Sequence, residues 1–441
     1  MKVAKFGGSS VANAQQFKKV KEIVLADKKR EVIVVSAVGK SSNEPIKVTD
    51  MLLDLEKARN SDQATSFLFK KISDRLLQIR DDLKIDLRLE NDLLEIKQNL
   101  VVCSHDYLIS RGEYLTAKLL AKYLGYQFID ASSILIFDGA DLDYQASKKA
   151  LMKVRQKFKN IVVPGFYGSK KDNAIHLMPR GGSDISGAIL ASLLNAELYE
   201  NWTDVSGILM ADPNIVNHSK RIDFLSYEEL QELSYMGFGI FQEEAILPVR
   251  EKQIPTKILN TNHPEEGGTL VGDFLNRNIE NKLITGIAGK KNYTVITIKK
   301  YQLNQHIEVL QQVLAVLQKY QIVANYVPSG NDSFIFLCQQ NPSNTNLDVA
   351  IHDLKVNKTL DEVKVVQDIA LVVAVSWQLS KRPSLAGKIL EFLDNSRINV
   401  KMVIQEGSNM KVVFGVNNGD YEKTIAKIYQ EASFYKMKVS A

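Results

Sequence analysis

The chain has 441 residues, of which 45% are hydrophobic, 24% charged and 8% aromatic. These ordinary values exclude a disordered, collagen-like or low-complexity protein, and the length predicts two or three domains. A formal net charge of +5 is too small for a chain of this length to suggest nucleic acid as a partner, because a phosphate-binding surface needs clustered cations.

Two cysteines, Cys103 and Cys338, stand far apart and without metal-ligand spacing. They argue against a disulfide framework and against a structural zinc site. The start, MKVAKFGGSS, holds no apolar stretch of signal-peptide length. No later run approaches the ~18 uninterrupted apolar residues of a membrane span. We therefore expect a cytoplasmic protein with no membrane partner.

Predicted strands and helices alternate over the first part of the chain, up to about residue 270. Helices are expected from Ala12 to about Lys29, over much of Ile46–Leu124, and from Arg180–Asp184 to about Asn195. This alternation predicts an α/β domain with a mainly parallel sheet between helices, whose ligands bind beyond the carboxyl ends of the strands. The predicted strands are Val3–Phe6, Val32–Val35, Gln127–Asp130, Ile161–Pro164, Leu198–Trp202 and, as the last one, Pro255–Leu259.

A domain boundary is expected near residue 280, in a stretch rich in Asn and Lys. Beyond it the apolar pattern repeats: Val313 and Leu317 correspond to Ile389 and Leu393, 76 residues later. Each copy has the strand and helix order of a ferredoxin-like βαββαβ module. The predicted domains are a catalytic domain at 1–280 and two small modules at 281–365 and 366–441.

The segment Lys5-Phe6-Gly7-Gly8-Ser9-Ser10 places a lysine near the end of a strand, two glycines in a turn and a helix start after them. Glycines let backbone N–H groups approach an anion without a Cβ clash, and the helix start adds positive partial charge. The pattern predicts a phosphate cradle that is not a P-loop. The alternative is a tight turn with a solvent-facing lysine.

The segment Arg180-Gly181-Gly182-Ser183-Asp184 repeats this arrangement at a second strand-to-helix junction. It adds an arginine suited to a carboxylate and an aspartate suited to a cationic group or a metal. Two such cradles on one sheet, each beside a cation, indicate an anionic cosubstrate such as a nucleoside triphosphate.

Two further motifs have both a structural and a functional interpretation. Glu113 stands in the first turn of a predicted helix, where the helix dipole alone favours a carboxylate. Alternatively, it points into a cleft and holds an ammonium group. Thr203-Asp204 forms an Asx-type turn or contacts an adenine or ribose. None of the six histidines lies near these motifs, so histidine general-base chemistry is not expected.

In their order and spacing these motifs resemble the aspartate kinases (aspartokinases) of the amino acid kinase family. The carboxy-terminal modules resemble the tandem ACT domains that bind an end-product amino acid in that family. The resemblance therefore implies an amino acid kinase fold followed by two ferredoxin-like ACT modules. The matching segments are Lys5–Ser10, Val35-Ser36-Ala37 with Gly39, Lys47–Asp50, Ser110–Leu120, Gly165-Phe166, Arg180–Asp184, Trp202–Pro213, Lys220–Asp223 and Asn260–Thr261.

The resemblance implies that ATP, with Mg²⁺, phosphorylates the β-carboxylate of L-aspartate, the first step toward lysine, threonine, methionine and diaminopimelate. It makes Lys5 and Asp184 catalytic: Lys5 stabilises charge on the phosphoryl group, and Asp184 organises the Mg²⁺ and phosphate cluster. No residue is assigned as a dedicated metal ligand. The implied ATP-binding residues are Lys5, Gly7, Gly8, Ser9, Ser183, Asp184, Thr203, Asp204 and Leu209. The implied aspartate-binding residues are Ser36, Thr49, Glu113, Phe166, Arg180, Gly182 and Ser183.

In that pocket Arg180 is expected to take the α-carboxylate and Glu113 the α-ammonium group. Lysine and threonine are the candidate effectors at the ACT modules. Because such modules commonly pair between subunits, we expect a homodimer or a dimer of dimers.

The chain departs from the family at Asn214, where arginine is common, and at Gly237–Glu243, where many members carry G-A-K-V-L-H-P. Two alternatives therefore stay open at this stage. One is another amino acid kinase, acting on acetylglutamate, glutamate or uridylate, and the other is a non-catalytic amino-acid sensor.

Overall fold

The computed structural model describes residues 1–59, 62–179, 181–237, 243–273, 283–340, 346–405 and 410–434. The chain forms two compact units. The first consists of Met1–Ile208, Arg221–Gln231 and Gly239–Asn276, and the second of Leu209–Lys220, Glu232–Phe238 and Arg277–Ala441. Two short segments that precede residue 280 thus pack with the carboxy-terminal part. The domain ranges 1–280, 281–365 and 366–441 stay predictions.

The first unit is built on an eight-stranded sheet with the order β10-β12-β11-β9-β1-β2-β6-β3. The six strands from β11 to β3 run parallel, and β12 is antiparallel to β11. The predicted α/β class with a mainly parallel sheet is confirmed. The strands are β1 Lys2–Phe6, β2 Arg30–Val35, β3 Gln127–Phe128, β6 Ile161–Pro164, β9 Leu198–Thr203, β10 Phe224–Leu225, β11 Thr256–Asn260 and β12 Thr269–Val271.

Several short strands escaped the sequence analysis, although the predicted strand at Gln127–Asp130 contains β3. The prediction that Pro255–Leu259 is the last strand of this part is wrong, because β12 follows it. A second sheet, with the order β5-β4-β7-β8, was also missed. Strands of two to four residues carry too little alternation to be distinguished from turns. The second sheet consists of β4 Ile136–Asp138, β5 Asp141–Leu142, β7 Tyr167–Lys170 and β8 Ile175–Leu177.

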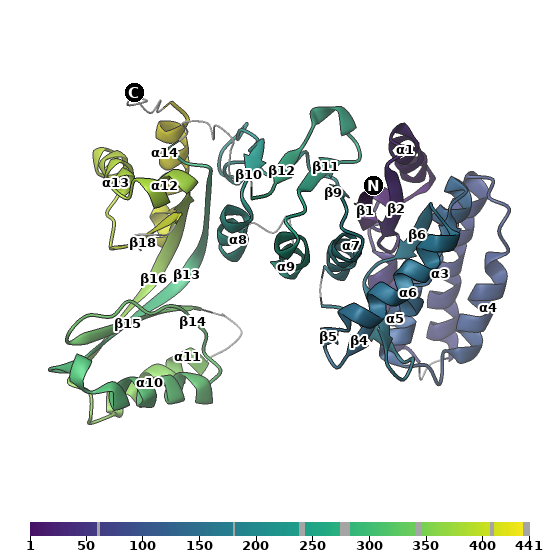
Figure 1. Ribbon diagram of the computed structural model, residues 1–441. Helices are drawn as coiled ribbons and strands as arrows, with labels where there is room; N and C mark the ends of the chain where they lie inside the picture. Colours follow the sequence, from purple (N-terminus) through teal and green to yellow (C-terminus); the bar gives the residue numbers. More distant parts are fainter. Residues whose placement is uncertain are drawn as a thin grey trace. The chain divides into compact units, whose positions relative to one another are not determined.

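Helices cover both faces of the large sheet (Figure 1). Helices α1 and α5 bury their apolar stripes against side chains such as Phe6 and Ile33, whereas α7 packs against α9 and β1. Helices α3, α4 and α5 pack side by side. None of the helices in the described ranges is both long and apolar enough to cross a bilayer. The helices up to residue 251 are α1 Ala14–Ala26, α2 Val48–Lys57, α3 Asp62–Asp82, α4 Leu89–Asn99, α5 His105–Leu124, α6 Tyr144–Lys157, α7 Gly182–Leu193, α8 Tyr227–Tyr235 and α9 Glu243–Glu251.

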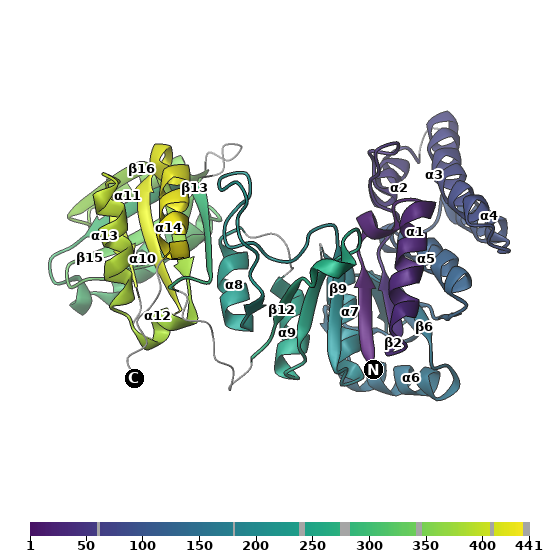
Figure 2. The ribbon, with the colours of Figure 1, turned by 90° about the horizontal axis from the view of Figure 1, so that it is seen from above.

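The second unit contains a six-stranded antiparallel sheet with the order β14-β15-β13-β16-β18-β17. Helices α10 and α11 lie side by side, as do α13 and α14 (Figures 1 and 2). The strands are β13 Gly286–Lys299, β14 Ala324–Tyr326, β15 Ser333–Gln339, β16 Glu362–Val375, β17 Met402–Ile404 and β18 Lys411–Asn417. The helices are α10 Ile307–Lys319, α11 Asn346–Val356, α12 Trp377–Lys381, α13 Leu385–Asn395 and α14 Tyr421–Phe434.

Two hydrophobic cores share the long strands β13 and β16. Val313 and Leu317 of α10 belong to one core, and Ile389 and Leu393 of α13 to the other. The register of β13 against β16 shifts between Lys290 and Tyr293. Such an irregularity changes which residues of a strand face the helices, so one strand serves both cores.

Candidate active site

The carboxyl ends of β1, β2, β9 and β11 meet at one edge of the large sheet. The Gly7 amide donates to Trp202 O at 3.0 Å, and the Ser36 amide donates to Phe6 O at 3.1 Å. The Thr261 amide donates to Thr203 O at 2.9 Å. The segments that follow these strands are therefore neighbours, as expected for a ligand site in a parallel sheet.

The first glycine turn is too closely packed to accept side chains. A Cβ atom on Gly8 would lie 2.9 Å from Ala37 O, and one on Gly39 would lie 2.3 Å from Gly8 C. The Gly39 amide donates to Gly8 O at 3.0 Å, which joins the two backbones. Gly8 and Ser9 open the short 3₁₀ helix η1 (Gly8–Val11). The turn thus presents bare backbone at the edge of the sheet, as a phosphate cradle requires.

Lys5, which is buried, and Asp184, which is partly buried, form an ion pair beside this turn. Lys5 is 7% exposed, and its Nζ lies 2.6 Å from Asp184 Oδ1. Asp184 stands in the first turn of α7, whereas Lys5 comes from β1. The interpretation of Lys5 as a solvent-facing lysine is therefore wrong. The two residues predicted to be catalytic are in direct contact.

Asn201 is a third member of this cluster that the sequence analysis missed. It is 2% exposed, it accepts from Lys5 Nζ at 3.3 Å, and its Nδ2 donates to Asp184 Oδ1 at 3.0 Å. Asn201 lies on β9 directly opposite Lys5 of β1 in the parallel register. The sequence feature that could have indicated Asn201 is a polar residue inside a strand predicted to be buried.

The second glycine turn brings together Phe166, Gly182 and Ser183. Phe166 adopts a φ of +77°, and its amide donates to Ser186 Oγ of α7 at 2.9 Å. A Cβ on Gly182 would lie 2.6 Å from Phe166 Cδ2, and one on Gly165 would lie 2.7 Å from Ser183 Oγ. Arg180, predicted to bind the α-carboxylate, lies outside the described residues.

Glu113 is a buried carboxyl group on α5. It is 4% exposed, and its Oε2 has no hydrogen-bond partner among the described residues. Burial raises the pKa of Glu113 to about 8, although a hydrogen bond from the Ala37 backbone and the charge of Arg111 oppose the rise. The interpretation of Glu113 as a first-turn carboxylate favoured by the helix dipole is wrong, because α5 begins at His105 and Glu113 lies eight residues further on. A buried acid with a free oxygen is suited to hold a cationic group of a ligand.

The remaining predicted residues are less closely tied to this centre. Thr49 stands in the first turn of α2, and Ser36 directly follows β2. Thr203 Oγ1 donates to the exposed Asp204 at 3.1 Å, which fits the turn interpretation of this pair as well as the nucleoside one. Leu209 belongs to the second unit, so its contact with a nucleoside stays a prediction.

Comparison with known proteins places these features in a family. Residues 1–260 match the amino acid kinase family, and residues 372–432 match the ACT domain. The chain is 32% identical over 448 residues to aspartokinase 3 of Bacillus subtilis (strain 168), with 98% of each chain covered. The chain belongs to the aspartokinases of the amino acid kinase family. It is an aspartate kinase, a transferase of amino-acid biosynthesis.

Other relatives agree with this assignment. The lysine-sensitive aspartokinase 3 of Escherichia coli (strain K12) is 26% identical, with 97% of this chain and 98% of the relative covered. The crystal structure of Clostridium acetobutylicum aspartate kinase has 39% identity and a TM-score of 0.90, and it covers 97% of this chain and 99% of its own. The predicted aspartokinase resemblance is confirmed. One of the two predicted ACT modules is matched, at residues 372–432.

Proposed function

We propose that this aspartate kinase transfers the γ-phosphoryl group of ATP to the β-carboxylate of L-aspartate at the edge formed by β1, β2 and β9. The Lys5–Asp184 pair beside the bare glycine turn is the observation that carries the proposal. A β-carboxylate oxygen attacks the γ-phosphorus, the bond to the β,γ-bridging oxygen breaks, and ADP leaves. The products are ADP and 4-phospho-L-aspartate.

The roles of the individual residues follow from their chemistry. A carboxylate with an ordinary pKa of about 3.9 is ionised near neutral pH, so the nucleophile needs no general base. Lys5 stabilises charge on the transferred group, and the backbone around Gly7, Gly8 and Ser9 cradles the phosphates. This assignment agrees with the absence of histidine from the motifs.

The donor set at Asp184 fits a magnesium ion carried by the nucleotide. Its carboxylate is a hard oxygen ligand of the kind that Mg²⁺ prefers, and Ser183 beside it adds a hydroxyl. When bound, the ion neutralises charge on the phosphates. Asn201 keeps the Asp184 carboxylate aligned with Lys5.

The aspartate pocket combines the second glycine turn with Glu113. In this proposal Glu113 holds the α-ammonium group, Arg180 takes the α-carboxylate, and Ser36, Thr49, Phe166, Gly182 and Ser183 complete the pocket. Thr203, Asp204 and Leu209 contact the nucleoside. Gly165 and Gly182 leave no room for a Cβ atom, and Phe166 adopts a positive φ beside them. This close packing supports a shaped pocket rather than an open turn.

Regulation belongs to the second unit. We propose that 281–365 and 366–441 form two ACT modules, that lysine or threonine binds to them, and that they pair in a homodimer or a dimer of dimers. The βαββαβ element order from β13 to β16 supports an ACT assignment for the first module. We also place the enzyme in the cytoplasm.

An ADP-release assay with a substrate panel tests the reaction. We expect turnover that requires both L-aspartate and ATP–Mg²⁺, with N-acetylglutamate giving a lower rate. Lys5→Met should lower kcat by about 10³-fold, because an electrostatic donor to the reacting group is lost. Lys18→Met, an exposed lysine on α1, is the matched control and should keep full rate. Full activity of Lys5→Met would remove Lys5 from the mechanism, and ADP release without aspartate would overturn the substrate assignment.

A further inference from the structure

Arg75 is a buried cation on helix α3. It is 7% exposed, and it lies on the buried stripe of α3 between Ile72 and Ile79. No acidic side chain in the described ranges forms an ion pair with it. Burial lowers the pKa of its guanidinium, and the charge of Glu44 opposes this shift. A buried charge that lacks an ion pair is costly, so a purely structural helix position would favour an apolar residue.

The guanidinium group of Arg75 binds both ends of one loop. Nη1 donates to Ile46 O at 2.5 Å, and Nη2 donates to Gly39 O. The planar guanidinium can reach two carbonyl groups at once, which a lysine ammonium on a single carbon chain does less well. We call residues 39–46 the clamped loop.

Both ends of the clamped loop adjoin segments assigned to substrates. At one end, the Gly39 amide donates to Gly8 O, and the two backbones are too close for a side chain. At the other end, Ile46 precedes α2, whose Val48 amide donates to Val38 O at 3.0 Å and whose first turn carries Thr49. One side chain therefore fixes the phosphate turn and the start of α2 together.

We propose that Arg75 is a positioning residue that holds the clamped loop against the Gly7–Gly8 turn, so that the phosphate cradle and the Thr49 segment keep their catalytic geometry. The proposal rests on the proposed function of these two segments. Arg75 touches no reacting atom: it acts through Gly39 and Ile46.

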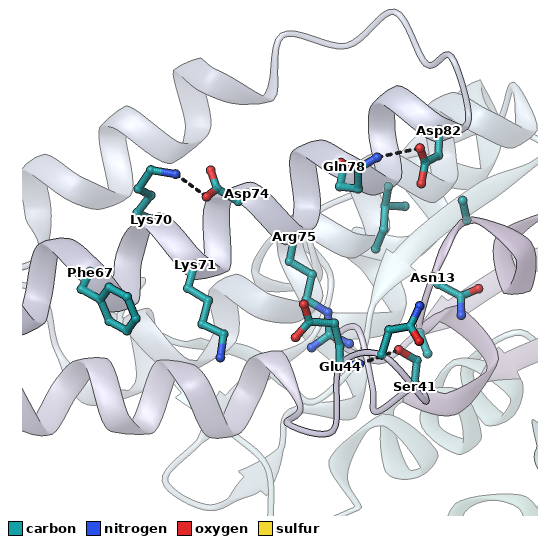
Figure 3. Close-up of a pocket in the computed structure, with 14 residues that line it drawn as sticks. Asn13, Ser41, Glu44, Phe67, Lys70, Lys71, Asp74, Arg75, Gln78 and Asp82 are labelled. Atoms are coloured by element: carbon teal, nitrogen blue, oxygen red, sulfur yellow. Dashed lines mark hydrogen bonds and ion pairs between the residues drawn. The ribbon is translucent and has the colours of Figure 1, made fainter.

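A solvent-accessible pocket of about 650 Å³ adjoins Arg75. Figure 3 shows Arg75 extending from α3 toward Glu44 and Ser41, with Lys71 one turn away on the same helix. A small ion can enter this pocket from solvent. Free guanidinium should therefore reach the space that Arg75→Ala leaves beside the two carbonyl groups.

Steady-state kinetics with chemical rescue tests the proposal. We expect Arg75→Ala to lower kcat/KM for ATP by about 10²-fold, as displacement of a catalytic segment by ~1 Å does. Guanidinium chloride at millimolar concentrations should restore activity at least fivefold, whereas ethylammonium chloride should not. Lys71→Ala removes an exposed charge from the same pocket wall and should match the wild type within twofold. Activity of Arg75→Ala within twofold of the wild type, or a loss that guanidinium does not reverse, would overturn the proposal.

Arg75→Lys keeps the charge and covers the case in which Arg75→Ala does not fold. We expect it to retain less than a tenth of the wild-type kcat/KM, and to speed amide hydrogen exchange at Gly39 and Val48. Unchanged exchange at these amides would show that Arg75 does not clamp the loop. Amide exchange is measured without substrates, so it tests the clamp by itself. The proposed function is tested separately, by whether the wild-type enzyme turns over aspartate and ATP.

Discussion

At the scale of single residues, Glu113 is a buried carboxyl group whose charged form is costly without a cationic partner. Its ordinary pKa of 4.5 is raised to about 8 by burial. Between these two values the folded protein keeps the proton and the unfolded chain has lost it. The folded state thus binds more protons, so the free energy of unfolding decreases as pH rises through this window. Above pH 8 the whole cost of burying the carboxylate is present unless a cationic ligand offsets it.

Glu113→Gln should therefore stabilise the ligand-free enzyme at alkaline pH. We expect its free energy of unfolding to exceed that of the wild type by up to about 5 kcal/mol at pH 8.5, because the pKa rises from 4.5 to about 8 and each pKa unit corresponds to ~1.4 kcal/mol. At pH 4 the difference should be small, because the carboxyl group is then neutral in the folded state and mostly neutral in the unfolded chain. Urea unfolding at the two pH values measures the difference, and calorimetry should show that the variant has lost aspartate binding.

The control for this prediction is Glu95→Gln, an exposed carboxylate on α4. It should shift the free energy of unfolding by less than about 0.5 kcal/mol at either pH, as surface substitutions usually do. If Glu113→Gln were less stable than the wild type at pH 8.5, or if it still bound aspartate normally, Glu113 would not be a buried acid that waits for an ammonium group.

At the scale of elements, the cluster of Lys5, Asp184 and Asn201 depends on strand pairing. β1 and β9 run parallel with Lys5 opposite Asn201, and α7 brings Asp184 to the same point. Asn201 suits this position because its amide accepts from a cation and donates to a carboxylate at the same time. Neither an aspartate nor an apolar residue at this position could do both.

Asn201→Leu should leave the Lys5–Asp184 pair without its neutral partner. We expect kcat to fall by about tenfold, equivalent to the ~1.4 kcal/mol of one buried hydrogen bond, and the Mg²⁺ concentration for half-maximal rate to rise. Asn201→Asp should be worse, because its carboxylate repels Asp184. Initial rates over a Mg²⁺ titration measure both effects, with Asn91→Leu on the exposed face of α4 as the control. An unchanged Mg²⁺ dependence in both Asn201 variants would show that Asn201 does not position Asp184.

The elements also show what could be predicted from the sequence. Short runs rich in apolar residues gave β1, β2, β6, β9 and β11 within two residues, because a strand buried on both faces of a parallel sheet is largely apolar. The glycine turns were equally clear, since close backbone contact leaves few alternatives to glycine. Arg75 had no local signal beyond an arginine on an apolar stripe. Its two acceptors lie 29 and 36 residues away, a separation that only the folded chain reveals.

At the scale of the whole molecule, the strands of the second unit were the largest departure. Two small modules were expected from the sequence at 281–365 and 366–441, and β13 and β16 each run for 14 residues. Each of the two strands contributes to both hydrophobic cores. A sequence repeat therefore need not fold into two separate sheets. Since the two hydrophobic cores share β13 and β16, a change in the packing of one core can bias the other through these strands.

Thermodynamic linkage between the proposed effector and aspartate can be tested by measuring the binding of each in the presence of the other. If lysine or threonine bound to the second unit weakens aspartate binding tenfold, aspartate must weaken effector binding by the same factor, a coupling of ~1.4 kcal/mol. We expect calorimetric titration of the effector to show this shift at saturating aspartate. The apparent KM for aspartate should rise to a plateau as the effector concentration increases. A KM that rises linearly without a plateau would indicate competition at the active site, because a separate site transmits only a finite coupling energy. D-lysine is the control and should leave both constants unchanged.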